Sequence, residues 1–461
     1  MTDAVTFVER VAAYAMRARF EDLSNLSLQQ VPIHILDSVG CQIAALGAGP
    51  INACRAQVED FGPTGSIPLI GGGTSNPLMA SFWHTALVRY VDAMDNILAP
   101  TETAHTADNF GGVWTAAVAN KVSGKDLMLG VALGWSVQSL LVVHGNFMSR
   151  GFDHTAQLAF SVPAAAGRLL GLTEKQIAHA IAMAASSDAS FAGIRAKPLS
   201  QWKGLASAQS TLGAFNTMYL AKRGVEGPLG IVEGATGIDN LLQHPLTIDW
   251  EHADYEGVAT ATIKKFIAMI HTQSAIECIL ELLNKSPVKA ADIISIEADV
   301  SKMTYDFSGG GLYGNAAADV STKEQADHSL PYLLAVAVLD GQVMQAQFTP
   351  QRINSADVQS LMKKVVTRLD ADFTRRYPKE FCARIIIRTK DGQVLTHEVS
   401  NYPGMPSHPF TWADATDKFD RLTQGNVTAA LSTEIKDVVK NIKDHSTEDL
   451  QKLLSAVSGP K

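Results

Sequence analysis

The sequence predicts a mainly helical protein, with a large all-helical domain and a smaller inserted α+β domain. Over the first 260 residues, apolar side chains recur at helical spacing and nothing alternates as strands do. From about residue 275 to 400, strand patterns appear between helical ones. The tail, Trp412 to Ser458, is helical again, so we predict that it rejoins the first domain. The predicted boundaries are residues 1–270 with 405–461 for the large domain and 271–404 for the small one.

The helices of the large domain are recognised by the residues at their ends. A helix is predicted to open at Pro32 and to end near Gly47, because a first-turn proline and a trailing glycine favour helix ends. Thr173 and Gln176 stand three residues apart and form a capping box before an alanine-rich helix. The apolar run Leu127–Val143 is shorter than a membrane span and contains three polar residues, so we predict a fully buried helix.

The small domain is predicted from two strand signals. Ile293–Val300 alternates in the manner of a strand. Ala383–Thr389 and Val394–Val399 are β-rich runs joined through Asp391-Gly392, which predicts a hairpin. Ser355–Leu369, between them, has a helical pattern and is predicted to be a helix.

Composition excludes several classes of protein. The chain has 461 residues, of which 46% are hydrophobic and 18% charged, as in soluble globular proteins. Its net charge of −8 is spread evenly, so we expect neither a nucleic-acid partner nor a membrane. The amphipathic N-terminus lacks the apolar core of a signal peptide. Four scattered cysteines without a CxxC pair argue against structural zinc and disulfides, and indicate a cytoplasmic location.

One polar stretch, Tyr90–Trp114, lies between two apolar helical patterns. It contains three acids, one histidine and a glycine pair: Asp92, Asp95, Asp108, His105 and Gly111–Gly112. A polar cluster between two buried helices is typical of a solvent-shielded site, so we expect the site here. The alternative is a polar loop with ordinary helix caps.

The acids allow a second hypothesis. Asp92-x-x-Asp95 near a helix end resembles an aspartate-rich magnesium motif of prenyl-diphosphate enzymes, because two carboxylates three residues apart share a helix face. The chain has no second aspartate-rich segment to complete such a site. The alternative is a pair of solvated helix-end acids.

Three histidines and one lysine are further candidates. His105, His154 and His271 each precede a threonine at a loop–helix junction, where a histidine is either functional or a surface and capping residue. Lys203 opens an alanine-rich helix, where it is placed to meet a carboxylate or to extend along the surface. No HExxH pattern indicates zinc. The letters Gly309-x-Gly311-x-x-Gly314 match a dinucleotide fingerprint, but no βαβ pattern surrounds them, so we predict a loop.

Five segments in order resemble one known family. The motifs are Asp92 followed by His105-Thr-Ala-Asp-Asn-Phe-Gly-Gly, Gly151-Phe-Asp-His154, Trp202-Lys203-Gly204, Ile270-His271-Thr-Gln-Ser-Ala and Ala326-Asp327-His328-Ser329-Leu330-Pro331-Tyr332. The chain thereby resembles the MmgE/PrpD family, and most closely its members that dehydrate 2-methylcitrate in propionate catabolism. The resemblance extends over most of the sequence.

The resemblance implies a helical domain with a smaller lid domain, a homodimer, and activity without metal or organic cofactor. It implies a lyase that dehydrates a small tricarboxylate such as 2-methylcitrate or citrate. The catalytic residues it implies are Asp92, His105, His154, Lys203 and His271. Elimination of water needs one base and one acid. We expect His105 with Asp92, and His154, to share these roles, while Lys203 and His271 hold carboxylates.

The sequence also departs from the dehydratase pattern. Thr106 stands where proline is usual, and Asn96 replaces a hydroxyl residue near the expected substrate. The exact substrate therefore stays open. A decarboxylase of cis-aconitate type or an epimerase of the same fold is the alternative. More remote alternatives are a magnesium-dependent prenyl-diphosphate enzyme and a catalytically inactive binding protein.

Overall fold

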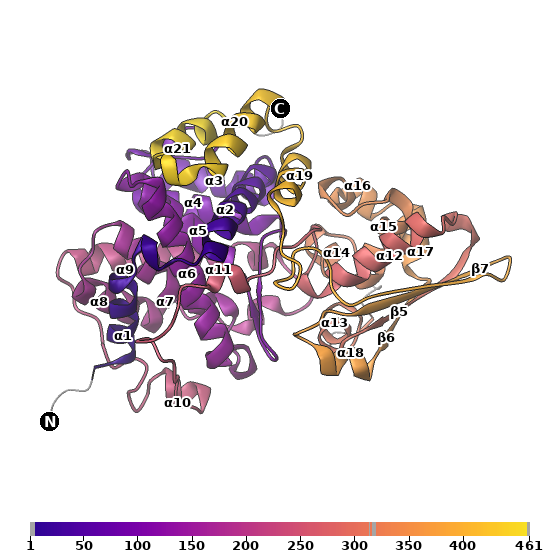
Figure 1. The fold of residues 1–461 in the computed structure, drawn as a ribbon, viewed down its shortest axis with the longest axis horizontal. Coiled ribbons are helices and arrows are strands. Elements are labelled where there is room, and N and C mark those ends of the chain that lie inside the picture. The colour runs from indigo at the N-terminus through magenta and orange to yellow at the C-terminus, as the bar shows by residue number, and fades with distance from the viewer. Residues whose placement is uncertain (1–4, 313, 316–319, 459–461) are drawn as a thin grey trace. The chain divides into compact units, whose positions relative to one another are not determined.

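The structure is a computed structural model that describes residues 5–312, 314–315 and 320–458. It divides into two compact units, and the chain as a whole is mainly helical, which confirms the predicted mainly helical class (Figure 1). The first, called the helical unit, comprises Met1–Ala196, Gln201–Thr262 and Thr411–Lys461. The second, called the mixed unit, comprises Lys197–Ser200 and Ile263–Phe410.

The helical unit is formed from both ends of the chain. Its helices are α1 (Phe7–Arg17), α2 (Asn25–Ala45), α3 (Gly49–Phe61), α4 (Pro77–Tyr90), α5 (Phe110–Ala119), α6 (Gly124–Gly145), α7 (Leu158–Leu169), α8 (Glu174–Ser187), α9 (Ala206–Lys222), α10 (Ile238–Leu242), α11 (Gly257–Thr260), α19 (Trp412–Thr423), α20 (Ala429–Lys440) and α21 (Thr447–Ser455). The C-terminal helices, yellow in Figure 1, lie beside the indigo and purple N-terminal ones, with α19 packed on α2 and α21 on α5. The return of the chain to this unit therefore completes its core.

The centre of the helical unit is formed by α4, α5, α6, α7 and α9. Helix α4 packs on α5 and α9, and α6 packs on α7. Close approach at α5 depends on Gly111, because a Cβ atom there would lie 2.3 Å from the backbone nitrogen of Thr85. Among the described residues, α6 is the one single helix long and apolar enough to cross a membrane, but most of it is buried within the unit. The prediction of a buried helix over Leu127–Val143 is therefore confirmed for most of its length, and Val143 near its end is exposed.

Helix α2 begins earlier than predicted. The Ser24 side chain accepts from the backbone N–H of Ser27 at 3.1 Å and caps the helix, which starts at Asn25. Pro32 therefore lies inside the helix instead of in its first turn. An interior proline removes one backbone hydrogen bond, and the extensive burial of α2 offsets that loss. The predicted capping box at Thr173 and Gln176 is confirmed at the start of α8.

The helical unit also contains two short hairpins. Strands β1 (Ile67–Pro68) and β2 (Thr74–Ser75) form one, and β3 (Ile97–Leu98) and β4 (Thr103–Ala104) form the other. Two-residue strands are too short to produce an alternating pattern. The second hairpin interrupts the polar stretch predicted to hold the site and delivers the chain to His105.

The mixed unit has a four-stranded sheet in the order β6-β5-β7-β8. β5 pairs in parallel with β6, and the other two pairings are antiparallel. Its elements are α12 (Gln273–Lys285), β5 (Ile293–Val300), α13 (Lys302–Ser308), α14 (Lys323–Ala326), α15 (Leu330–Asp340), α16 (Pro350–Ile353), α17 (Ala356–Met362), β6 (Val365–Leu369), α18 (Ala371–Arg376), β7 (Ala383–Thr389) and β8 (Val394–Val399). The predicted hairpin is confirmed, with Gly392 at a φ of +84° in its turn.

One prediction for the mixed unit, the helix at Ser355–Leu369, is wrong, and a second concerns the glycine motif at Gly309. Ser355–Leu369 was predicted as one helix, but the chain turns after α17 and its β-branched end becomes strand β6. Pairing of Val365–Leu369 with β5 outweighs the local helical pattern there. The glycine motif begins where α13 ends, at Gly309, and does not connect a strand to a following helix as a dinucleotide fingerprint does. Residues 313 and 316–319, in and after this motif, lie outside the described residues.

Candidate active site

The end of helix α4 places Asp92 between two cations. Helix α4 ends at Tyr90, and Asp92 follows in the left-handed region with a φ of +59°, which is rare for a residue other than glycine. Its Oδ1 lies 3.3 Å from Arg89 Nη1, and its Oδ2 lies 3.2 Å from Lys203 Nζ. All three side chains are buried. Lys203 is therefore not an extended surface lysine, and the carboxylate it meets is Asp92.

A buried ion pair supports this unusual turn from the C-terminal helices. Lys418 on α19 donates to the backbone carbonyl of Ala93 at 2.7 Å and pairs with the carboxylate of Asp37 on α2. Burial raises the pKa of Asp37, and the charge of Lys418 opposes that rise. Because strained backbone persists only where the surroundings hold it, the Lys418–Ala93 bond is placed to maintain the conformation of Asp92.

Asp95 organises the loop that carries His105. Its carboxylate accepts from Trp135 Nε1 at 2.7 Å, from Thr106 Oγ1 at 2.8 Å and from the Ala107 backbone N–H at 2.7 Å, and it also pairs with His34. Burial alone would raise the pKa of Asp95, but these bonds outweigh it and hold the pKa below its usual value. Thr106, the residue that departs from the family pattern, is thus one of the anchors of this loop.

The same contacts remove the basis for an aspartate-rich magnesium motif. Asp92 and Asp95 both follow the last residue of α4, so they do not share a helix face. Four protein donors engage the Asp95 carboxylate, and Asp92 is bracketed by Arg89 and Lys203. Carboxylates that hold a hard cation need oxygens directed at the ion. The prenyl-diphosphate alternative is not supported by this geometry.

Two histidines face each other inside the helical unit. His105 follows strand β4 and begins the short turn η2 (Thr106–Asn109), and His154 begins the turn η4 (His154–Gln157). Their ring centroids are 4.9 Å apart, with an angle of 66° between the planes. His105 is 8% exposed and His154 is 4% exposed. His105 Nδ1 lies 3.3 Å from the backbone carbonyl of Asp95, a contact that fixes the ring when Nδ1 carries the hydrogen.

His154 lies among charged partners. Its Nδ1 is 3.5 Å from Asp153 Oδ1, and its Nε2 is 3.5 Å from Asp108 Oδ2. Arg195 donates to Asp153 through Nε at 2.6 Å and through Nη2 at 3.1 Å. Burial alone would raise the pKa of Asp153, but Arg195 and His154 hold it well below its usual range. Asp153 therefore stays ionised and keeps Arg195 beside His154.

Asp108 connects the group of Asp92 and its two cations with the pair of histidines. Ser207 on α9 donates to Asp108 Oδ2 at 2.6 Å, and Arg89 Nε lies 3.9 Å from Asp108 Oδ1. Arg89 therefore stands between Asp108 and Asp92. A continuous series of contacts results, and its members in order are Lys203, Asp92, Arg89, Asp108, His154 and His105.

The structure thus brings four of the five predicted site residues into one buried cluster: Asp92, His105, His154 and Lys203. The sequence did not predict the roles of Arg89, Asp153 and Arg195. Arg89 had a visible signal, because it precedes Asp92 by three residues at a helix end. Arg195 had none, because the loop that brings it to Asp153 follows no periodic pattern.

His271 belongs to the mixed unit and has a different environment. Phe307 stacks on its ring at a centroid distance of 5.9 Å, and Tyr377 and Phe381 lie 6.0 Å away. Burial and the charge of Lys264 lower the pKa of His271 to about 3. The imidazole is therefore neutral near pH 7, so it would hold a carboxylate through a hydrogen bond and not through its charge. It retains hydrogen-bonding capacity, because Nδ1 has no partner among the described residues.

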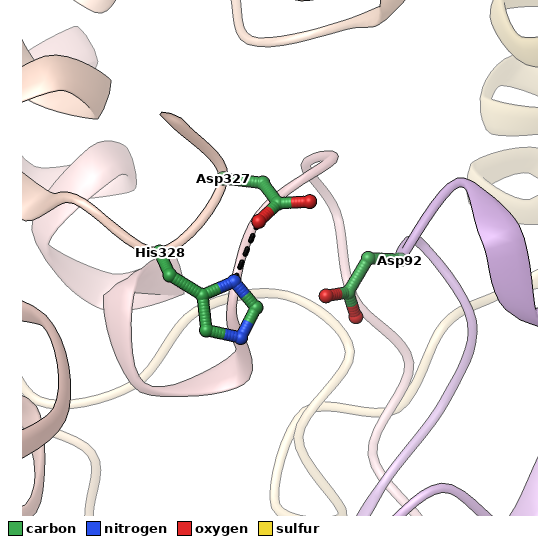
Figure 2. Close-up of side chains that lie close together, drawn as sticks. All are labelled: Asp92, Asp327 and His328. Atoms are coloured by element: carbon green, nitrogen blue, oxygen red, sulfur yellow. Dashed lines mark hydrogen bonds and ion pairs between the residues drawn. The ribbon is translucent and has the colours of Figure 1, made fainter. Parts of the chain in front are cut away.

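The mixed unit also contains the motif around His328. His328 Nδ1 and Asp327 Oδ1 are 2.6 Å apart, the interaction drawn as a dashed line in Figure 2. Lys323 Nζ donates to the other carboxylate oxygen of Asp327 at 2.8 Å. Asp327 is fully buried. Figure 2 also draws Asp92, which follows helix α4 by two residues.

A helical unit that buries two facing histidines among paired acids and bases is suited to proton transfer. Comparison with protein families identifies both parts of the chain. The MmgE/PrpD N-terminal domain matches residues 9–251, and the MmgE/PrpD C-terminal domain matches residues 266–444. The chain belongs to the MmgE/PrpD family, and within it to the dehydratase-like enzymes.

Individual relatives are distant but extend over most of the chain. A 2-methylcitrate dehydratase of Salmonella typhimurium is 24% identical over 408 residues, 83% of either chain. The mitochondrial 2-methylcitrate dehydratase of Yarrowia lipolytica is 25% identical over 434 residues, 87% of this chain and 80% of the relative. The alkylcitrate dehydratase phiI of a fungal species is 24% identical over 456 residues, 90% of this chain and 86% of the relative.

Proposed function

We propose that the chain dehydrates a small tricarboxylate such as 2-methylcitrate or citrate by general acid–base elimination, without a metal or organic cofactor. The observation that carries the proposal is the buried pair His105 and His154, whose rings lie 4.9 Å apart. Two imidazoles at this separation suit an elimination, which removes a proton at one carbon and protonates a hydroxyl at the next. The names of the relatives support the same class of reaction.

His105 is the base in this proposal, and His154 is the acid. The hydrogen on His105 Nδ1 is directed to the Asp95 carbonyl, which leaves Nε2 as the basic nitrogen. Asp108 and Asp153 flank His154 and can hold a positive charge on its ring. His105 takes the proton from carbon, the C–O bond breaks, and the hydroxyl leaves as water with the proton of His154. Exchange with solvent then restores both histidines.

The cations of the cluster suit a substrate with several carboxylates. A tricarboxylate carries about three negative charges at neutral pH. Arg89, Lys203 and Arg195 present N–H donors, but acids of the protein already balance much of their charge. Directed hydrogen bonds therefore do more to recognise the substrate than a strongly positive field.

Incubation with candidate substrates tests the proposal. The protein is mixed with 2-methylcitrate, citrate or cis-aconitate in EDTA, and absorbance of the conjugated double bond is followed together with CO2 release. Formation of the double bond from a citrate without CO2 is the expected result. No turnover of either citrate, or turnover abolished by EDTA, would contradict it.

A second candidate is decarboxylation or epimerisation of a related polycarboxylate on the same cluster. Asn96 favours it, because this buried residue replaces a hydroxyl residue of the dehydratase pattern, and its Oδ1 has no partner within the described ranges that would keep it from a substrate donor. The backbone N–H of Asn96 donates to the Thr262 carbonyl at 2.8 Å, and its side-chain Nδ2 donates to Thr103 Oγ1 at 3.4 Å, which orients the amide. CO2 release from cis-aconitate, with both citrates inert, would favour this candidate.

We also propose a cytoplasmic homodimer that binds neither nucleic acid nor membrane. The acidic net charge and the family resemblance support this. Light scattering at several concentrations tests the dimer, and cell fractionation tests the location. A monomeric mass, or recovery with membranes, would contradict these two points.

A further inference from the structure

A buried carboxyl group outside the histidine cluster joins the two segments that carry the histidines. Glu102 lies in the turn of the β3–β4 hairpin, three residues before His105, and is fully buried. Its Oε1 accepts from Gln157 Nε2 at 2.5 Å. Gln157 is the last residue of η4, the turn that begins with His154, and is also fully buried. One side-chain contact thus links both histidine segments.

The contact contains one acceptor too many for an ionised Glu102. Within the described part of the chain, Glu102 Oε2 and Gln157 Oε1 both lack a hydrogen-bond partner. Two buried acceptors without donors are costly. A proton on Glu102 turns Oε2 into a donor, and the acid and the amide can then form two hydrogen bonds side by side.

The charges around Glu102 also favour its neutral form. Burial and, to a smaller extent, the charge of Asp153 raise its pKa to about 8, although hydrogen bonds from the backbone N–H groups of Phe147 and Met148 and from the Gln157 side chain oppose the rise. Arg195 is engaged by Asp153, and Arg150 is directed to Gln243.

The other titratable groups on the surrounding segments are histidines. His154 lies beside Asp108 and Asp153, His105 faces the Asp95 carbonyl, and His144 at the end of α6 is exposed. No cation among the described residues forms an ion pair with Glu102.

We propose that Glu102 is a positioning residue that must be protonated to hold the His105 segment against the His154 segment, so that its ionisation sets the upper pH limit of the enzyme. An ionised Glu102 would face Asp153 and lose the second bond to Gln157. The hairpin and the η4 turn would then separate, and the two imidazoles would lose their alignment. The part of the proposal that concerns activity rests on the proposed function.

Histidine NMR tests the positioning without any substrate. Proteins labelled at histidine Cε1 are titrated from pH 6 to 10, and the resonances of His105 and His154 are assigned with His105→Gln and His154→Gln. In the wild type we expect both resonances to show an inflection near the pKa of Glu102. Glu102→Gln keeps an N–H donor in place of the acid proton and should abolish the inflection. The exposed control Glu251→Gln should retain it.

Two results would overturn the proposal: an unchanged inflection in Glu102→Gln, or none in the wild type. If Glu102→Gln does not fold, Asp153→Asn gives a second test. Loss of the Asp153 charge favours an ionised Glu102, so the inflection should move to lower pH, and an unmoved inflection would contradict the proposal.

Activity gives the second readout. With 2-methylcitrate as substrate, the alkaline limb of kcat should move up by about one pH unit or more in Glu102→Gln. An unmoved limb, in an enzyme that turns over, would contradict the role of Glu102. If no polycarboxylate is turned over at all, the proposed function fails, while the NMR titration still decides the role of Glu102.

Discussion

His154 in the helical unit and His271 in the mixed unit are both buried, but their surroundings are opposite. His154 contacts Asp108, Asp153 and Arg195, all of them charged. His271 is enclosed by aromatic rings, and burial lowers its pKa to about 3. Burial alone therefore does not define a catalytic histidine. A catalytic histidine is defined by neighbouring groups that can stabilise its charged form.

The largest expected effect is the loss of kcat when a histidine of the charged cluster is replaced. His154→Gln, or His105→Gln, removes a proton-transfer group and should lower kcat by about 10²- to 10⁴-fold. The exposed His144→Gln is the control and should be neutral. Steady-state kinetics with 2-methylcitrate measure both. Activity within about threefold of wild type in both cluster variants would show that proton transfer takes place elsewhere.

The sequence predicted much of this cluster but not its supports. Asp92, His105, His154 and Lys203 stand in recognisable motifs, and the structure places them together. Lys418 is more than 300 residues from the turn that it supports, so only the path of the folded chain reveals the contact. The same limit applies to β6, whose local pattern is helical but whose partner β5 makes it a strand.

The next effect tests whether the helical unit depends on its buried ion pair. Lys418→Met leaves Asp37 buried without its cation and should destabilise the protein by about 3–5 kcal/mol. Denaturant unfolding measures the change, and Lys440→Met, at an exposed helix end, is the matched control. Adding Asp37→Asn should recover part of the loss. Equal stability of Lys418→Met and its control would contradict this support.

A smaller effect concerns the stability of the helical unit at low pH. The pKa of Asp153 is lowered in the folded state, so its contribution to stability is complete above its unfolded pKa of about 4 and is lost as pH falls further. Asp153→Asn should therefore lower the free energy of unfolding at pH 7 by about 1–3 kcal/mol, and by much less at pH 3. Thermal unfolding against pH measures this, with the exposed Asp60→Asn as control. A difference that does not vary with pH would rule out this origin.

The smallest effect belongs to the mixed unit. His271 is neutral near pH 7, so His271→Asn removes at most a neutral hydrogen bond and should lower kcat/KM by up to about tenfold. The shape of the pH profile between pH 5 and 8 should stay as in the wild type. Loss of an inflection from that profile would mean that His271 titrates there, and the contrast with His154 would disappear.

The central claim is that His105 and His154 act together as base and acid on a tricarboxylate. The most direct measurement is the rate of double-bond formation from 2-methylcitrate in EDTA for the wild type, both single glutamine variants and the double variant. If the pair acts as one unit, the double variant should be about as slow as the slower single variant, because either loss already removes the reaction path. A wild-type enzyme that forms no double bond, or a double variant as fast as the wild type, would contradict the claim.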